Sequence, residues 1–244
     1  MTTAATGFPL LGSQPAGNFF IPDSTRRHTL GATVPVSDPY WGGQELIYLA
    51  VPVSTALKVG HAVTWDSTNN IVALPNTAGQ GVPVAFALNA VASDAANVQY
   101  GWFVIEGRCP AYSNASVAAA ALIGVVAAGQ LGAVANGKEI NNARVAIAAT
   151  GTVVKASVAT QSGSNLLRTT VGGTDGWFVG VAVTGTGIPA STTITAIDPD
   201  NRTVTMSANA TATGSVSVTG TYNDGTSFFN IVTVDRPFAQ GQVT

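Results

Sequence analysis

Three stretches of the chain have spacings that could do chemistry, and each fails at one required position. GAVANGKE, Gly132 to Glu139, has P-loop spacing, but Glu139 stands where Ser or Thr should hold magnesium. GTGIPA, which starts at Gly185, fits a dinucleotide-binding turn, but strand-like IPASTTIT follows where a helix should open. DPD at 198–200 offers two carboxylates, whereas calcium takes about six to eight oxygen ligands. These stretches predict turns.

Side chains for acid, base or nucleophilic catalysis are few and scattered. His28 and His61 are the only histidines, Cys109 is the only cysteine, and no G-x-S-x-G motif occurs. A glycosidase would need a pair of carboxylates. The glutamates are Glu45, Glu106 and Glu139. The sequence therefore predicts no catalytic, cofactor-binding or metal-binding residues, and we expect a protein that is not an enzyme.

Low charge is the main feature of the composition. Charged residues make up 9% of the 244 residues, against roughly 25% in soluble proteins generally. With a net charge of −2 and little basic character, the chain predicts no nucleic-acid partner and no membrane partner. The N-terminus lacks the charged and apolar regions of a signal peptide, so we expect synthesis and folding in a cytoplasm. Weak self-repulsion favours a subunit of a large assembly, and a stable β protein of the secreted type is the alternative.

Apolar residues at a spacing of two predict the elements that carry these residues. TITAI and TVTMS flank the turn-forming DPDNR and predict a hairpin with strands near 192–197 and 203–207. ELIYLAVPV, VQYGWFVIEG and SFFNIVTVDRPF are apolar on both faces, which is typical of strands covered on both sides. Because short strands and turns recur about every 8–12 residues, we expect an all-β sandwich or barrel.

Composition divides the chain into three parts. Residues 1–43 hold five of the twelve prolines and show no sustained period, which predicts an extended N-terminal arm. Residues 44–160 with 224–244 predict a β-sandwich or barrel body. The Thr-rich residues 161–223 predict a small inserted β module, a meander of four short strands, after which the last strand returns to the body. Two domains in series is the alternative.

Two further expectations concern the body. The Ala-rich residues 115–129 predict one short helix, although Gly124 and the neighbouring valines favour a strand. The alternation of apolar residues places four side chains in the core, namely Phe86, Trp102, Val104 and Phe229.

Apolar and basic residues of the arm form the expected contact surface. A disordered linker seldom carries NFFIP, so this arm should lie on its own body or on a neighbour. Arg26, Arg27 and His28 form the only basic cluster, for which a solvated turn is the alternative. The residues expected to contact a binding partner or another subunit are Phe8, Phe19, Phe20, Ile21, Arg26, Arg27, Tyr40 and Trp41.

Three segments resemble structural proteins of tailed phages. RHTLGATVPVSDPYWGGQELIYLAVP, which ends at Pro52, is similar to the start of a family of phage head proteins. GQGVPVAFALNAVASDAANVQYGWFVIEGRCPAY, together with AAGQL near Gln130, resembles capsid decoration, or cement, proteins. The Thr-rich stretch from VTGTGIPA to SVSVTGTY is similar to a small β module of phage heads and tail fibres. In the segment that resembles decoration proteins, Cys109 and Pro110 occupy positions where small residues are common.

The resemblance implies a capsid decoration protein, bound as a homotrimer to the outer surface of an icosahedral phage head. Its partners would be the major capsid protein and itself, and its location the virion. One alternative is a head-fibre or tail adhesin that grips a host glycan through exposed Trp or Tyr; the four tryptophans otherwise serve the core or subunit contacts. A tail hydrolase is the remaining alternative, with the few glutamates against it.

Overall fold

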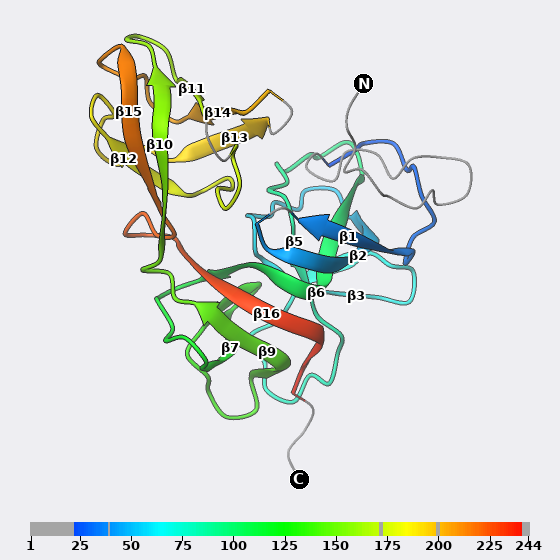
Figure 1. Cartoon of the computed structure of the whole chain (residues 1–244). Helices are drawn as coiled ribbons and strands as arrows, with labels where there is room; N and C mark the ends of the chain where they lie inside the picture. Colours follow the sequence, from blue (N-terminus) through cyan, green and yellow to red (C-terminus); the bar gives the residue numbers. More distant parts are fainter. Residues whose placement is uncertain (1–21, 39, 171–172, 199–200, 241–244) are drawn as a thin grey trace. The chain divides into compact units, whose positions relative to one another are not determined.

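The structure, a computed structural model, describes residues 22–38, 40–170, 173–198 and 201–240. The chain is all-β: these residues form sixteen strands and no helix (Figure 1). This confirms the fold class expected from the alternation of apolar residues. Four of the expected contact residues, Phe8, Phe19, Phe20 and Ile21, lie outside the described residues.

The described chain divides into two compact units. We call Ala149–Phe228 the insert and the residues on either side of it the body. The insert starts earlier than the expected module at 161–223. Its first strand, β10 (Thr152–Thr160), pairs with β11 (Leu166–Arg168) and β15 (Gly214–Thr221), so these hydrogen bonds place β10 in the insert.

A closed barrel of five strands forms the centre of the body. Its strands are β6 (Gln99–Ser113), β7 (Leu122–Ala127), β8 (Gln130–Gly132), β9 (Glu139–Ile147) and β16 (Phe228–Ala239). They pair in the order β16-β9-β7-β8-β6, and β6 pairs again with β16. Closure gives every strand of the ring a partner on both sides, which removes free sheet edges there.

A sheet of shorter strands extends from β6, the longest strand. It comprises β1 (Thr33–Asp38), β2 (Gly42–Val51), β3 (Ala62–Trp65), β4 (Ile71–Ala73) and β5 (Ala85–Ala87). β2 pairs with β6 and with β1, whereas β5 links β6 to the β3–β4 hairpin. The turn between β3 and β4 contains Asn69 and Asn70.

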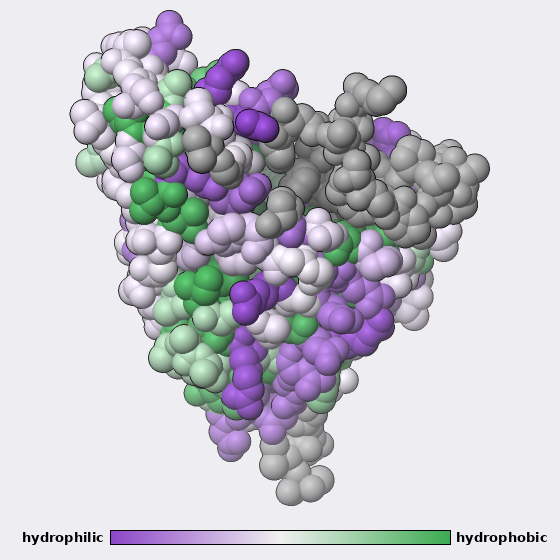
Figure 2. Space-filling model, viewed as in Figure 1, coloured by the Kyte–Doolittle hydropathy of each residue, from purple (hydrophilic) through white to green (hydrophobic). Residues whose placement is uncertain are grey.

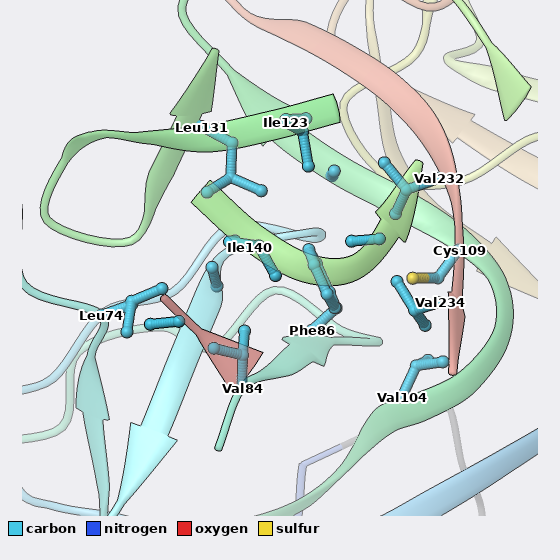
Figure 3. Packing of buried hydrophobic residues seen from close by; sticks show 14 of the residues in the cluster. Leu74, Val84, Phe86, Val104, Cys109, Ile123, Leu131, Ile140, Val232 and Val234 are labelled. Atoms are coloured by element: carbon cyan, nitrogen blue, oxygen red, sulfur yellow. The ribbon is translucent and has the colours of Figure 1, made fainter. Parts of the chain in front are cut away.

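Two apolar cores cover the two faces of β2 and β6. Leu46 and Val104 belong to the core inside the barrel, whereas Ile47 and Phe103, next to them in the chain, belong to the second core. Such alternation explains why both strands are apolar on both faces. Figure 3 shows the barrel core, where side chains from several strands point toward one another. The expected core residues Phe86, Trp102, Val104 and Phe229 are 0%, 4%, 0% and 2% exposed, as predicted.

The insert is a second ring of strands. Its six strands pair in the order β12-β15-β10-β11-β14-β13, with β12 at Ala182–Gly185, β13 at Ile194–Asp198 and β14 at Thr203–Met206. Backbone bonds from Gly180 N to Ile194 O and from Val183 N to Thr192 O, both 2.9 Å, join its two ends. The β13–β14 hairpin is confirmed. The predicted meander of four strands is wrong. In a meander each strand pairs with the next one along the chain, whereas β12 pairs with β15 and β14 pairs with β11.

The chain leaves and re-enters the body at paired residues. Ile147 of β9 lies opposite Ile231 of β16 in an antiparallel pair. The insert therefore occupies the position of a turn between these two strands. The returning strand β16 has its ladder partners in the body, as the two-sided pattern of SFFNIVTVDRPF predicts.

The helix expected over residues 115–129 is wrong, because this segment contains the strand β7. Ile123 and Val125 alternate into the barrel core, and Gly129, with a φ of +68°, makes the turn into β8. Gly124 lies opposite Gly132 in the ladder. The burial gained by completing the barrel outweighs the helix propensity of alanine.

The second half of the expected arm is part of the body. β1 pairs with β2 over its whole length, and Val34 is fully buried. Backbone bonds link Asp23 and Tyr100 in both directions, at 2.9 and 2.8 Å. Pro35 sits at a position of this edge strand whose N–H would point away from β2, so it removes no ladder bond. The prolines of the expected arm therefore hid the strand β1 from the sequence pattern.

Candidate functional site

Arg26 and Arg27 lie where the chain first docks on the body. The Arg27 guanidinium forms an ion pair with Asp23, and its backbone N–H donates to the Tyr48 hydroxyl at 3.2 Å. Arg26 Nε donates to the His28 carbonyl at 3.0 Å. Both arginines are exposed, so each presents a cation at a fixed place on the surface.

His28 does not belong to this basic surface. Its ring is buried beside Tyr48 and Trp102, at centroid distances of 5.2 and 5.4 Å. The cluster predicted from RRH therefore splits into two exposed cations and one anchor. The aromatic contacts and the Asp23 bonds fix the start of the described chain on β2 and β6.

The ionisation states of Asp23, Arg27 and Tyr48 favour the contacts that fix the start of the described chain. The hydrogen bond from Arg27 lowers the pKa of Asp23, and the same bond raises the pKa of Arg27. Burial raises the pKa of Tyr48. Near neutral pH the ion pair and the neutral phenol are therefore both maintained.

Tyr40 and Trp41 form an aromatic pair at the β1–β2 turn. Their rings meet edge to face with centroids 4.6 Å apart, and Tyr40 is 43% exposed. One carboxylate oxygen, Asp38 Oδ1, accepts the backbone N–H groups of both residues, at 2.7 and 2.6 Å. Gly42 follows with a φ of +88°, a conformation that glycine adopts without strain. The turn holds the aromatic pair in one orientation.

The structure does not bring the described contact residues into one site. Arg26 and Arg27 precede β1, and Tyr40 and Trp41 follow it. Six strand residues at about 3.3 Å each separate the two groups by roughly 20 Å. They are two separate features of the same hairpin.

Two of the three glutamates lie opposite each other in the body. Glu45 lies opposite Glu106 in the β2–β6 ladder. The Glu45 carboxylate is bonded to the Arg236 guanidinium, which offsets the repulsion between the two acids. This arrangement is explained as an ion pair between β2 and β16.

The remaining chemical motifs form turns and strands. GAVANGKE runs from the end of β8 into β9, and the Lys138 ammonium donates to Asn76 Oδ1 at 2.9 Å. GTGIPA is a turn closed by a bond from Ile188 N to Gly185 O at 3.0 Å. The described residues contain no group of three or more His, Cys, Asp or Glu side chains that could share a metal ion. Nor does any helix in this part of the chain have the length and apolarity to cross a bilayer.

The tryptophans divide into two classes. Trp102 and Trp177 are buried, and the Trp177 indole N–H donates to the Val153 carbonyl at 3.2 Å. These two serve the cores. Trp41 and Trp65 are partly exposed, and Trp65 packs against the second core.

Sequence reasoning missed the residues that fix the arm to the body. Asp23 stands four residues before Arg27, which is a recognisable ion-pair spacing. Tyr48 and Tyr100 gave no such signal, because their roles depend on contacts between distant strands. With this geometry described, the comparisons with known proteins add no relative: no protein-family model, no curated protein and no solved structure matches the chain.

Proposed function

We propose that the chain is a structural virion protein, a decoration or cement protein that binds the outer surface of an icosahedral phage head and stabilises it. The observation that carries the proposal is the resemblance of two segments to tailed-phage head and decoration proteins. The first segment forms β1 and β2, and the second forms β5 and β6. β2 and β6 pair along Glu45–Val51, so the resembling residues build one continuous sheet.

The architecture suits a protein that must keep its shape on a shell. The body barrel leaves no open edge along its ring, and two cores support the sheet that extends from it. We propose that the major capsid protein is contacted by residues 1–21 with their apolar Phe8, Phe19, Phe20 and Ile21. Counted from the anchor at Asp23, a chain of this length spans at most about 75 Å. A homotrimer on the shell remains part of the proposal.

The test uses phage heads that lack the protein. Full-length chain is added, and binding is measured by co-sedimentation while head disruption is followed by calorimetry. We expect the full chain to bind and to raise the disruption temperature. Failure of the full chain to bind would reject the proposed function.

A second variant tests the arm separately. Deletion of residues 1–21 leaves Asp23 and β1 in place, whereas deletion of 1–43 would also remove a strand of the body. We expect the shorter deletion to keep the melting temperature of the body and to weaken binding by about tenfold or more, equivalent to about 1.4 kcal/mol. Unchanged binding would show that the body alone holds the shell.

The Tyr40–Trp41 pair, in which Tyr40 is exposed and Trp41 partly exposed, favours one alternative, a head-fibre or tail adhesin that binds a host glycan. An aromatic face on a fixed turn can stack on a sugar ring. Binding to host-surface polysaccharide that is lost in Tyr40→Ala, with no binding to heads, would support this function instead.

A further inference from the structure

An uncharged apolar patch covers the outer face of β7 and β8. From Cys109 to Gly137 the chain contains no charged residue and no histidine. Leu122 and Val134 are 39% and 37% exposed there. Figure 2 shows hydrophobic residues gathered at the lower left, over the part of the body where Figure 1 draws β7 and β9.

The exposed residues are continuous because two glycines lie between them. Ile123 and Val125 point into the barrel, so Leu122, Gly124 and Val126 face outward. The main chain at Val134 passes over Gly124, 3.2 Å from where a Cβ would be. The Asn114 and Val126 side chains both lie against Gly132, at 2.4 and 2.9 Å from the corresponding point. Leu122, Val126 and Val134 thus lie around the two glycines, and we call these three residues the β7 patch.

A partner can reach this patch only through side chains. β7 is hydrogen-bonded to β8 on one side and to β9 on the other, so no further strand can be added. Short and β-branched side chains lose little entropy when they are covered. Contiguous exposed apolar side chains are a feature of protein interaction surfaces.

Opposite charges on β9 border the patch. Arg144 lies opposite Leu122, and Glu139 lies opposite Gly124, both on the outer face. Arg144 is exposed, whereas Glu139 Oε2 is buried with no hydrogen-bond partner among the described residues. Lys138, the other charge nearby, donates to Asn76. A base therefore stands toward one end of the patch and an acid toward the other.

We propose that the β7 patch is a two-fold self-association surface, on which a second copy of this chain packs with Arg144 of each copy facing Glu139 of the other. A two-fold axis reverses the order of residues across the contact, so each base meets an acid. The uncharged centre can face its own copy without like-charge repulsion. This inference concerns the isolated protein and does not rest on the proposed function.

Sedimentation of the full chain over a concentration series tests the patch. We expect a monomer–dimer equilibrium whose Kd rises by about tenfold or more in Leu122→Asp and in Val134→Asp. Val72→Asp is the matched control, because Val72 on β4 is 53% exposed and lies outside the patch. Circular dichroism checks that each variant is folded. A wild-type chain that stays monomeric or forms only trimers, or patch variants that still dimerise, would overturn the proposal.

A charge exchange tests the two-fold pairing itself. Arg144→Glu and Glu139→Lys should each weaken the dimer, because each places like charges together twice. An equimolar mixture of the two variants should dimerise again, since both contacts then pair an acid with a base. A mixture as weak as its components would refute the pairing. Loss of head binding in the patch variants, with an unchanged oligomeric state, would assign the patch to the capsid instead.

Discussion

Replacing Phe86 by Ala should destabilise the body more than most single substitutions. The ring is fully buried in the barrel core, in the same cluster as Val84, Val104, Ile140 and Val234 (Figure 3). Removing a buried Phe side chain costs about 3–5 kcal/mol, from lost transfer energy and from the cavity. Because the neighbouring residues sit largely on hydrogen-bonded strands, the cavity cannot readily collapse. We therefore expect the upper half of that range, about 4–5 kcal/mol.

Urea denaturation and calorimetry measure this loss. Since the insert is a separate compact unit, Phe86→Ala should lower the transition of the body and leave that of the insert unchanged. Val72→Ala is the control, an exposed apolar residue of the same sheet, for which we expect a change within about 0.5 kcal/mol. A loss below about 1 kcal/mol for Phe86→Ala would refute the packing described for the barrel.

Three further predictions follow from single features. Asn230→Leu should lower the free energy of unfolding by about 2–4 kcal/mol, measured by urea denaturation. The buried Asn230 amide accepts from Val117 N at 2.9 Å and donates to Ala115 O at 3.0 Å, and the variant loses both bonds. An unchanged denaturation midpoint would contradict a stabilising role for these two bonds. Burial lowers the pKa of His61 from 6.5 to about 4, so the unfolded chain binds the proton more tightly, and the free energy of unfolding should fall as pH drops from 6.5 toward 4. His61→Gln should reduce the dependence of this free energy on pH, measured by denaturation across the range. Equal pH dependence in the wild type and the variant would contradict the prediction. Deleting 149–228 and closing the gap with a short Gly-Ser turn should leave a cooperatively folding body, since β9 and β16 are paired where the insert begins; loss of cooperative unfolding would show that the body needs the insert.

Local pattern predicted the strands that depend on their own sequence. The hairpin around DPDNR was predictable because Asp198 and Asn201 carry their own turn chemistry, with Asp198 Oδ1 accepting from Asn201 N at 3.0 Å. The two-sided strands β2 and β6 were predictable because both of their faces are buried in cores. The second half of β16 is instead exposed on one face, at Thr233, Asp235 and Arg236. In each case, a few neighbouring residues carry the whole signal.

Long-range pairing accounts for the features that the pattern missed. The alanines before Leu122 favour a helix locally, and only the distant strand β9 makes that segment part of a barrel. β10 resembles the strands of the body, but its partner β15 lies far along the chain. The described contact residues were expected on an extended arm, and their separation along β1 depended on a strand that Pro35 hid from the sequence pattern.

The most direct test of the proposed function is the copy number of this chain in purified virions. Quantitative mass spectrometry gives its ratio to the major capsid protein, and brief protease treatment of intact virions reports whether it lies on the outside. A cement protein should be present as a large, fixed fraction of the capsid subunits and should be accessible without opening the head. A handful of copies per virion would indicate a tail or fibre protein, and absence from virions would contradict the account.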